Sequence, residues 1–241
     1  MTTNINGALD RLIRKYGLPP GEIIDAEHSP AIRTHGGEFA LLPWRVERRF
    51  IELKNLIDNN TLEHVSTLRF ASITAGGDLL RQVARELDLA TWLAGSPVAS
   101  LFAACSGRAA ANLIVKLESG IRLSIECCNR LPAGRETIDR HEIIARRGVA
   151  SDRVVDTQVP QSSIYAFTHK GDARHTDTDA ELFGLSEPAT ALVRAAFAVL
   201  RDPALGAEWN TAAAASQRLI EAMIQSDATS AVVSLQGKKT T

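Results

Sequence analysis

Two arginines, Arg81 and Arg85, stand four positions apart in a segment whose apolar spacing predicts a helix over residues 78–93. At this spacing the two guanidinium groups share one helix face, and Asp88, three positions after Arg85, is within reach as an ion-pair partner. One interpretation is a solvated face with a local ion pair. The other is an anion site, because a planar guanidinium holds a carboxylate or phosphate through two parallel hydrogen bonds. Arg81, Arg85 and Asp88 are therefore the candidate site for a small anionic ligand.

Other residues that could carry chemistry are less well placed. His141 and Glu142 are neighbours on an expected strand, so their side chains point to opposite faces and do not form a dyad. The basic residues Arg45, Arg48 and Arg49 fall on the polar side of an expected amphipathic helix, which is typical of a solvated surface. We expect neither a catalytic residue nor a metal site among them.

Nucleotide-binding and cysteine patterns also argue against a cofactor. No two of the 16 glycines are separated by one residue, so neither a dinucleotide fingerprint nor a phosphate loop can be assembled. Three cysteines, an odd number, fit a reducing compartment, and the adjacent Cys127 and Cys128 would point to opposite faces of a strand. We expect ordinary half-buried or buried thiols, no bound cofactor and a cytoplasmic location.

The elements that position these residues form one large sheet with helices before and after it. Residues 111–118 and 121–128 alternate apolar with polar side chains across Ser119-Gly120, which is typical of a hairpin with one buried face. Helices are expected at 8–17, 46–60, 78–93, 187–202 and 207–226, and strands at 38–44, 64–74, 98–105, 111–118, 121–128, within 138–168 and at 231–235. This order predicts an α+β fold, with a large, mainly antiparallel open sheet and helices packed on one face. As domains we expect an N-terminal helix and irregular arm over 1–37, the α+β domain over 38–236 and a disordered tail over 237–241.

Charge and composition exclude several classes of protein. The chain has 241 residues, 45% of them hydrophobic and 23% charged, as in an ordinary globular protein. Lys plus Arg number 27 against 28 for Asp plus Glu, so there is no net field to attract nucleic acid or an anionic membrane. No stretch is apolar for long enough to span a membrane.

Two segments resemble the Gfo/Idh/MocA family, the glucose-fructose oxidoreductase and inositol dehydrogenase group. Residues 43–70 carry Arg49-Phe50 at the start of a helix that leads into a strand, and residues 76–95 run from Gly76-Gly77 to Asp88-Leu89, Trp92-Leu93 and Gly95. The alanine-rich helix and last strand near the C-terminus are also similar to the family. The resemblance covers about residues 38–236 and is to the second, C-terminal domain. It implies the α+β fold named above, and a sheet whose open face is used for dimerisation.

The chain departs from the family pattern in two ways. The family's first domain is a Rossmann domain that binds NAD or NADP and supplies a Glu-Lys-Pro lysine, yet no lysine precedes a proline anywhere here. The family's dehydrogenases carry an aspartate and a proton-accepting histidine on the matched helix, and these positions are Arg81 and Arg85 here. Because a guanidinium stays protonated and has no acceptor, it cannot take a proton from an alcohol.

Two functional classes follow. The first is a protein without its own nucleotide-binding domain and without catalysis of its own, which dimerises through its sheet and binds an anionic, sugar-type ligand. The second is a subunit of a heteromeric NAD(P)-dependent sugar or polyol oxidoreductase whose Rossmann domain lies on a partner chain.

Overall fold

The computed structural model describes all residues except 1, 27–28, 153–162, 169–170, 177–183 and 236–241. The tail expected over 237–241 lies outside the described residues. The chain forms two compact units, each made of two stretches of sequence. We call residues 1–48 with 178–215 the small-sheet unit, and residues 49–177 with 216–241 the large-sheet unit. The division expected from the sequence, into 1–37, 38–236 and 237–241, stays a prediction.

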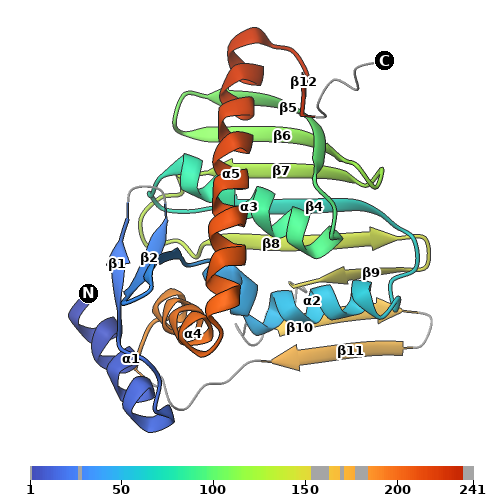
Figure 1. Cartoon of the computed structure of the whole chain (residues 1–241). Helices are drawn as coiled ribbons and strands as arrows, with labels where there is room; N and C mark the ends of the chain where they lie inside the picture. Colours follow the sequence, from blue (N-terminus) through green and yellow to red (C-terminus); the bar gives the residue numbers. More distant parts are fainter. Residues whose placement is uncertain (1, 27–28, 153–162, 169–170, 177–183, 236–241) are drawn as a thin grey trace, which may run out of the picture. The chain divides into compact units, whose positions relative to one another are not determined.

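The small-sheet unit has an antiparallel sheet in the order β1-β2-β3, with α1, α4 and the start of α5 around it (Figure 1). The elements are α1 (Thr2–Tyr16), β1 (Gly21–Asp25), β2 (Pro30–Thr34), β3 (Gly37–Ala40), the 3-10 turn η1 (Pro43–Val46), α4 (Glu187–Arg201) and α5 (Pro203–Thr229), which continues into the other unit. Leu9, Ile32 and Trp209 lie in its apolar core. The sequence led us to expect an irregular segment up to residue 37, and this was wrong, because short strands with few apolar positions leave little periodic signal.

The large-sheet unit is built on nine strands in the order β11-β10-β9-β8-β4-β7-β6-β5-β12, which Figure 1 shows as a stack of ribbons. Its elements are α2 (Arg48–Asp58), β4 (Val65–Ile73), α3 (Leu79–Ala94), β5 (Val98–Ser106), β6 (Ala110–Leu117), β7 (Arg122–Cys128), β8 (Ile138–Ala145), β9 (Gly148–Ser151), β10 (Ser163–Thr168), β11 (Gly171–Thr176) and β12 (Val233–Ser234). Among the strands that the structure describes, every pairing in this sheet is antiparallel except that of β4 with β7. The prediction of an α+β fold with a large, mainly antiparallel sheet is confirmed.

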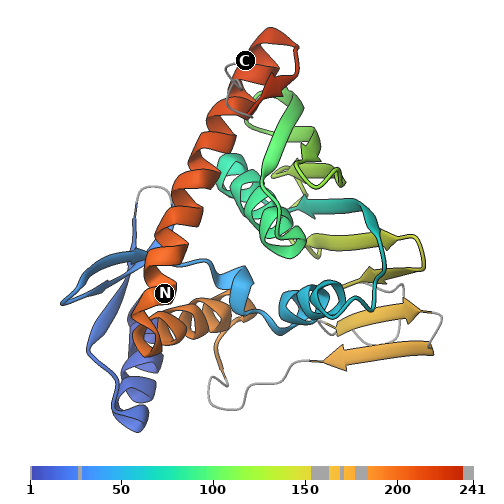
Figure 2. The same cartoon turned by 45° about the vertical axis from the view of Figure 1, so that its right-hand side comes forward.

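Helix α3 packs on one face of this sheet, against β4, β6 and β7 (Figure 2). It begins where the Asp78 side chain accepts a hydrogen bond from the Leu80 amide, and it ends at Gly95, which has the left-handed φ of 57°. On β6 and β7 buried and exposed residues alternate, so the face under α3 is core and the opposite face is open. None of the helices in the described part of the chain is long and apolar enough to cross a membrane.

Candidate functional site

Helix α3 carries charged side chains on its buried side. Leu79, Val83 and Ala90 follow the helical period toward the sheet, and Glu86 falls on the same stripe, with its side chain fully buried. A carboxylate at such a depth is stable only when charged or hydrogen-bonding partners surround it. The partners come from β8, from the residue after β9 and from α2.

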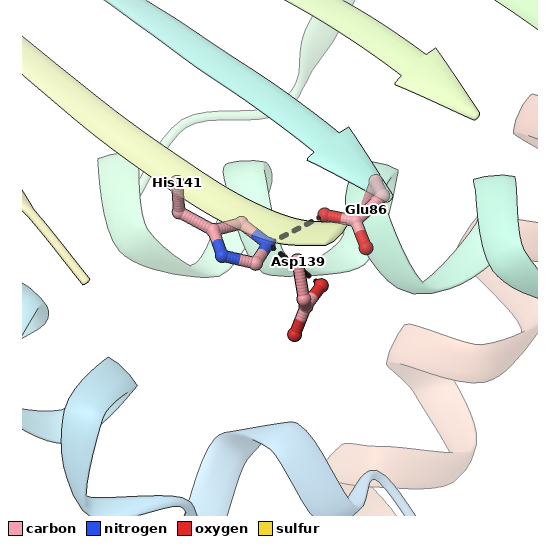
Figure 3. Close-up of side chains that lie close together, drawn as sticks. All are labelled: Glu86, Asp139 and His141. Carbon is pink, nitrogen blue, oxygen red and sulfur yellow. Dashed lines mark hydrogen bonds and ion pairs between the residues drawn. The ribbon is translucent and has the colours of Figure 1, made fainter. Parts of the chain in front are cut away.

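His141 on β8 lies at the centre of this arrangement, and its side chain is also fully buried. Its ring Nε2 lies 2.8 Å from Glu86 Oε2, and its Nδ1 lies 2.6 Å from Asp152 Oδ2, both within hydrogen-bonding distance. The rings of Phe50 and Phe70 contact it edge-on, each with centroids 4.8 Å away. Figure 3 shows the histidine pointing from its strand toward Glu86 on the helix, with Asp139 beside them.

Two arginines complete the arrangement around Asp139. Arg85 binds this carboxylate in a bidentate manner, from Nη1 to Oδ1 at 2.8 Å and from Nη2 to Oδ2 at 2.9 Å, and also donates to Glu86 Oε1 at 2.9 Å. Arg49 donates to Asp139 Oδ2 at 2.6 Å and to Asp152 Oδ2 at 3.2 Å. We call Arg49, Arg85, Glu86, Asp139, His141 and Asp152 the six-residue cluster.

The two carboxylates that flank the His141 ring indicate its protonation state. An ionised carboxylate only accepts hydrogen bonds, so a ring that is bonded to carboxylates at both nitrogens must donate from both. Such a ring is an imidazolium cation, and with it the cluster holds three cations and three carboxylates and is neutral. Burial alone would lower the pKa of His141, but the charges of Asp152, Glu86 and Asp139 and the bond to Asp152 raise this pKa to about 9.

On its outer side the cluster consists of Asp139 and the two arginines, and their charges stabilise one another. Burial opposes the charge of Asp139, yet Arg85, His141 and Arg49 hold the pKa of this carboxyl well below its usual range. The side chains of Arg49, Arg85 and Asp139 are 17%, 19% and 20% exposed, whereas those of Glu86, His141 and Asp152 are fully buried. The cluster therefore reaches solvent only on the side of Asp139 and the two arginines.

Three of these residues offer ligand atoms close enough together for a metal ion. One atom each of Glu86, Asp139 and His141 lies within 4.8 Å of the other two, and Asp152 orients the histidine as a carboxylate often does beside a metal. Each of the three atoms, however, already has a partner. A divalent ion would have to replace the proton on His141 Nε2 and displace Arg85 from Asp139 Oδ1, and would leave the cluster with a net positive charge. The arrangement fits a proton better than a metal ion.

The three residues named from the sequence are in different environments. Arg81 is exposed on the first turn of α3, Arg85 belongs to the six-residue cluster, and Asp88 is buried with 2% exposure. The bidentate partner of Arg85 is Asp139, which sequence spacing did not suggest. The anion site formed by Arg81, Arg85 and Asp88 stays a proposal.

Sequence reasoning missed most of the cluster. The prediction that His141 and Glu142 point apart is confirmed, since His141 is buried and Glu142 lies on the other face of β8, near Arg69. The prediction that Arg49 is solvated was wrong, because Asp139 and Asp152 bind it in a largely buried position. One available signal was Glu86, a charged residue on the apolar stripe of a predicted helix.

The cysteines have no part in this site. Cys127 is buried, Cys105 and Cys128 are half-buried, and all three are free thiols, as expected. Burial raises the pKa of the Cys127 thiol, and burial with the nearby Asp227 raises that of Cys105. Thiols with raised pKa values are weak nucleophiles at neutral pH.

Comparison with known proteins shows which solved structures share the fold of this chain. No protein-family profile matches the chain, and no curated protein matches it in sequence. Solved structures do match, among them levoglucosan dehydrogenase in complex with NADH and levoglucosan, with a TM-score of 0.63 and 13% identity over 81% of this chain and 65% of that one. The aldose-aldose oxidoreductase of Caulobacter crescentus matches with a TM-score of 0.60 and 15% identity, over 80% of this chain and 62% of that chain. The myo-inositol 2-dehydrogenase of Lactobacillus plantarum matches with a TM-score of 0.59 and 12% identity, over 81% of this chain and 64% of that chain.

These matches agree with the resemblance seen in the sequence. Identities this low establish the fold and not the activity, and the chain spans less than two thirds of the length of the proteins it matches. The chain has the fold of the C-terminal domain of Gfo/Idh/MocA-type oxidoreductases.

Proposed function

We propose that this chain is an oxidoreductase-like protein that does not transfer hydride on its own and that assembles with a second copy through the open face of its large sheet. The position and contacts of Arg85 support the proposal that the chain does not transfer hydride on its own. This arginine stands where the resemblance puts a proton-accepting histidine, and it is engaged with Asp139 and Glu86. A permanently protonated side chain bound to two carboxylates supplies no base to a substrate hydroxyl.

The open face of β5, β6 and β7 supports the second half. Its middle row contains Phe102 opposite Ile114 and Ile114 opposite Ser124, and Ile114 is 58% exposed. Lys116 pairs with Arg122 at one end of these strands, and Asn112 pairs with Glu126 at the other. A two-fold axis that runs across the strands would lay the basic end of one copy over the acidic end of the other, with Ile114 near the centre.

Sedimentation equilibrium tests this assembly. The wild-type chain is expected to form dimers, and Ile114→Asp should weaken the dimer by roughly tenfold or more, because the new carboxylate would be desolvated without a partner. Ile224→Asp is the matched control, since Ile224 is 51% exposed but lies on α5 and not on the sheet. A monomeric wild type, or equal effects of the two substitutions, would contradict the proposal.

A partner chain with a nucleotide-binding domain is the second candidate. It is favoured by the lack of any G-x-G segment in this sequence, since one of the oxidoreductases that it matches in structure was solved with NADH. By this proposal the chain alone binds neither NAD nor NADP in calorimetric titrations. A complex purified from the native host should contain a chain with a G-x-G-x-x-G segment and should bind the nucleotide. Low-micromolar binding of either nucleotide by the isolated chain would contradict this proposal.

The small anionic ligand is proposed to bind at the site of Arg81, Arg85 and Asp88, with Arg81 as its exposed contact. Arg81 is exposed, whereas Arg85 is largely buried and holds Asp139 of β8 against α3, so removal of each should give a different result. In calorimetry against sugar acids and sugar phosphates, Arg81→Ala should weaken binding by about one to two orders of magnitude. Arg85→Ala should act mainly on folding. Binding by neither wild type nor variants, or unchanged binding by Arg81→Ala, would remove the anion site from the account.

A further inference from the structure

The six-residue cluster contains one cation that can lose its charge near neutral pH. The guanidinium groups of Arg49 and Arg85 stay protonated at any pH at which a protein folds, but an imidazolium does not. Three carboxylates lie around the His141 ring: Glu86 from α3, Asp139 from its own strand and Asp152 after β9. Arg85 from α3 and Arg49 from α2 bind these carboxylates, and the rings of Phe50 from α2 and Phe70 from β4 pack against the imidazole. The carboxylates therefore outnumber the arginines.

We propose that the large-sheet unit folds with the uptake of one proton onto His141, so that the six-residue cluster is a proton-dependent lock joining α2, α3 and β8. The geometry leaves little room for a neutral ring. A neutral imidazole donates from only one nitrogen, so either Glu86 Oε2 at 2.8 Å or Asp152 Oδ2 at 2.6 Å would face a lone pair. The cluster would then also carry an uncompensated negative charge away from water.

The direction of the pH effect follows from the two states of the chain. In the unfolded chain the pKa of His141 takes its ordinary value of 6.5, and in the folded unit it is raised to about 9. A raised pKa gives stability that is fully present below pH 6.5 and is lost as the pH rises from 6.5 through about 9. Asp139 acts in the opposite direction at low pH, since its pKa is lowered and its contribution disappears only in acid.

The lock weakens within the range in which cells and their compartments differ in pH. In the interval where the folded unit holds one proton more than the unfolded chain, the unfolding equilibrium constant rises by about tenfold per pH unit. Loss of the proton removes the donor to Glu86 or to Asp152, and so weakens one contact between β8 and α3 or one between β8 and the residue after β9. The opening should therefore start at β8 and α3.

Hydrogen exchange of the full chain, read on peptides from α3 and β8 and corrected for the intrinsic pH dependence of exchange, tests the lock. Protection in the wild type should fall by up to about tenfold per pH unit between pH 6.5 and about 9. His141→Arg, which keeps a cation at any pH, should show little pH dependence over this interval. His64→Asn is the matched control, because His64 is exposed in the same unit at a positive φ of 54° that asparagine accepts, and it should keep the wild-type slope.

A second variant keeps the test decisive if His141→Arg does not fold. Glu86→Gln is isosteric and removes one of the two carboxylates that hold the proton, so the fall in protection should move to lower pH. Wild-type protection that is constant across the interval would overturn the proposal. A slope that His141→Arg and Glu86→Gln leave unchanged would overturn it as well, since another group would then be titrating. Neither result bears on dimerisation, which sedimentation measures separately.

Discussion

The two units satisfy their polar groups in different ways. In the small-sheet unit neutral amides do so at the sheet edges: Asn6 on α1 bonds to both the N–H and the C=O of Ile23 on β1, and Asn210 on α5 bonds to the Ala40 N–H and the Glu38 C=O on β3. β1 and β3 are the two edges of that sheet, so each asparagine takes the place of a further strand. In the large-sheet unit full charges are buried between helix and sheet, and they depend on one another.

This contrast predicts which unit tolerates substitution. Removal of an edge asparagine leaves two backbone groups at a sheet edge, where water can bind them. Removal of one charged side chain leaves the six-residue cluster with an uncompensated charge in the interior. Stability in the small-sheet unit should thus change in small, local steps. In the large-sheet unit it should fall sharply when one member of the cluster is removed.

The largest effect is expected for Asp152→Ala. The Asp152 side chain is fully buried and accepts hydrogen bonds from the His141 ring, the His141 amide and Arg49. Its removal should destabilise the large-sheet unit by about 3 to 5 kcal/mol, measured by urea unfolding. Glu142→Ala, on the open face of β8, is the control and should cost well under half as much. Equal losses would mean that the cluster does not stabilise the unit.

A packing change comes next, in the small-sheet unit. A Cβ on Gly206 would lie 2.7 Å from the Phe39 ring and 3.0 Å from Val199, so Gly206→Ala should cost about 1 to 3 kcal/mol despite the better helix propensity of alanine. Gly7→Ala is the control on α1, where a Cβ would meet nothing within 4 Å. It should stabilise the unit by about 0.5 to 1 kcal/mol in thermal unfolding. The same sign for both substitutions would contradict this packing.

The edge amides should contribute less. Asn6→Ala removes both hydrogen bonds to Ile23 and is expected to cost about 1 to 2 kcal/mol. Faster hydrogen exchange at β1, with β4 and β8 unchanged, is the expected pattern. Loss of protection in the large-sheet unit would show that the two units do not respond separately.

The smallest effect is expected for an ion pair on the surface. Arg33 and Glu38 are paired at 2.8 Å, with side chains 56% and 50% exposed. A double-mutant cycle with Arg33→Ala and Glu38→Ala should give about 0.2 to 1 kcal/mol, because solvent and salt screen exposed pairs. A coupling energy as large as the effect of Asp152→Ala would contradict the expectation that buried charges contribute more than exposed ones.

The sequence predicts the parts of the large-sheet unit that depend on local patterns. Alternation defines β6 and β7, and Asp78 with Gly95 brackets α3 within a residue of the expected ends. The parallel pairing of β4 with β7 has no local signature, since it brings together strands separated by α3, β5 and β6. The cluster has none either, because its members come from four separate parts of the chain. Only Glu86, on the apolar stripe of α3, and Arg49, one residue before a core phenylalanine, could have pointed to it.

The neutrality of the six-residue cluster and its dependence on pH both require that His141 is an imidazolium cation. Nitrogen-15 NMR of the histidine side chains in the full chain near neutral pH, assigned with His141→Gln, measures it directly. We predict that both ring nitrogens of His141 carry protons, with signals of an imidazolium held in two hydrogen bonds. A neutral ring with one unprotonated nitrogen at that pH would contradict the neutral, three-cation cluster and the proton-dependent lock derived from it.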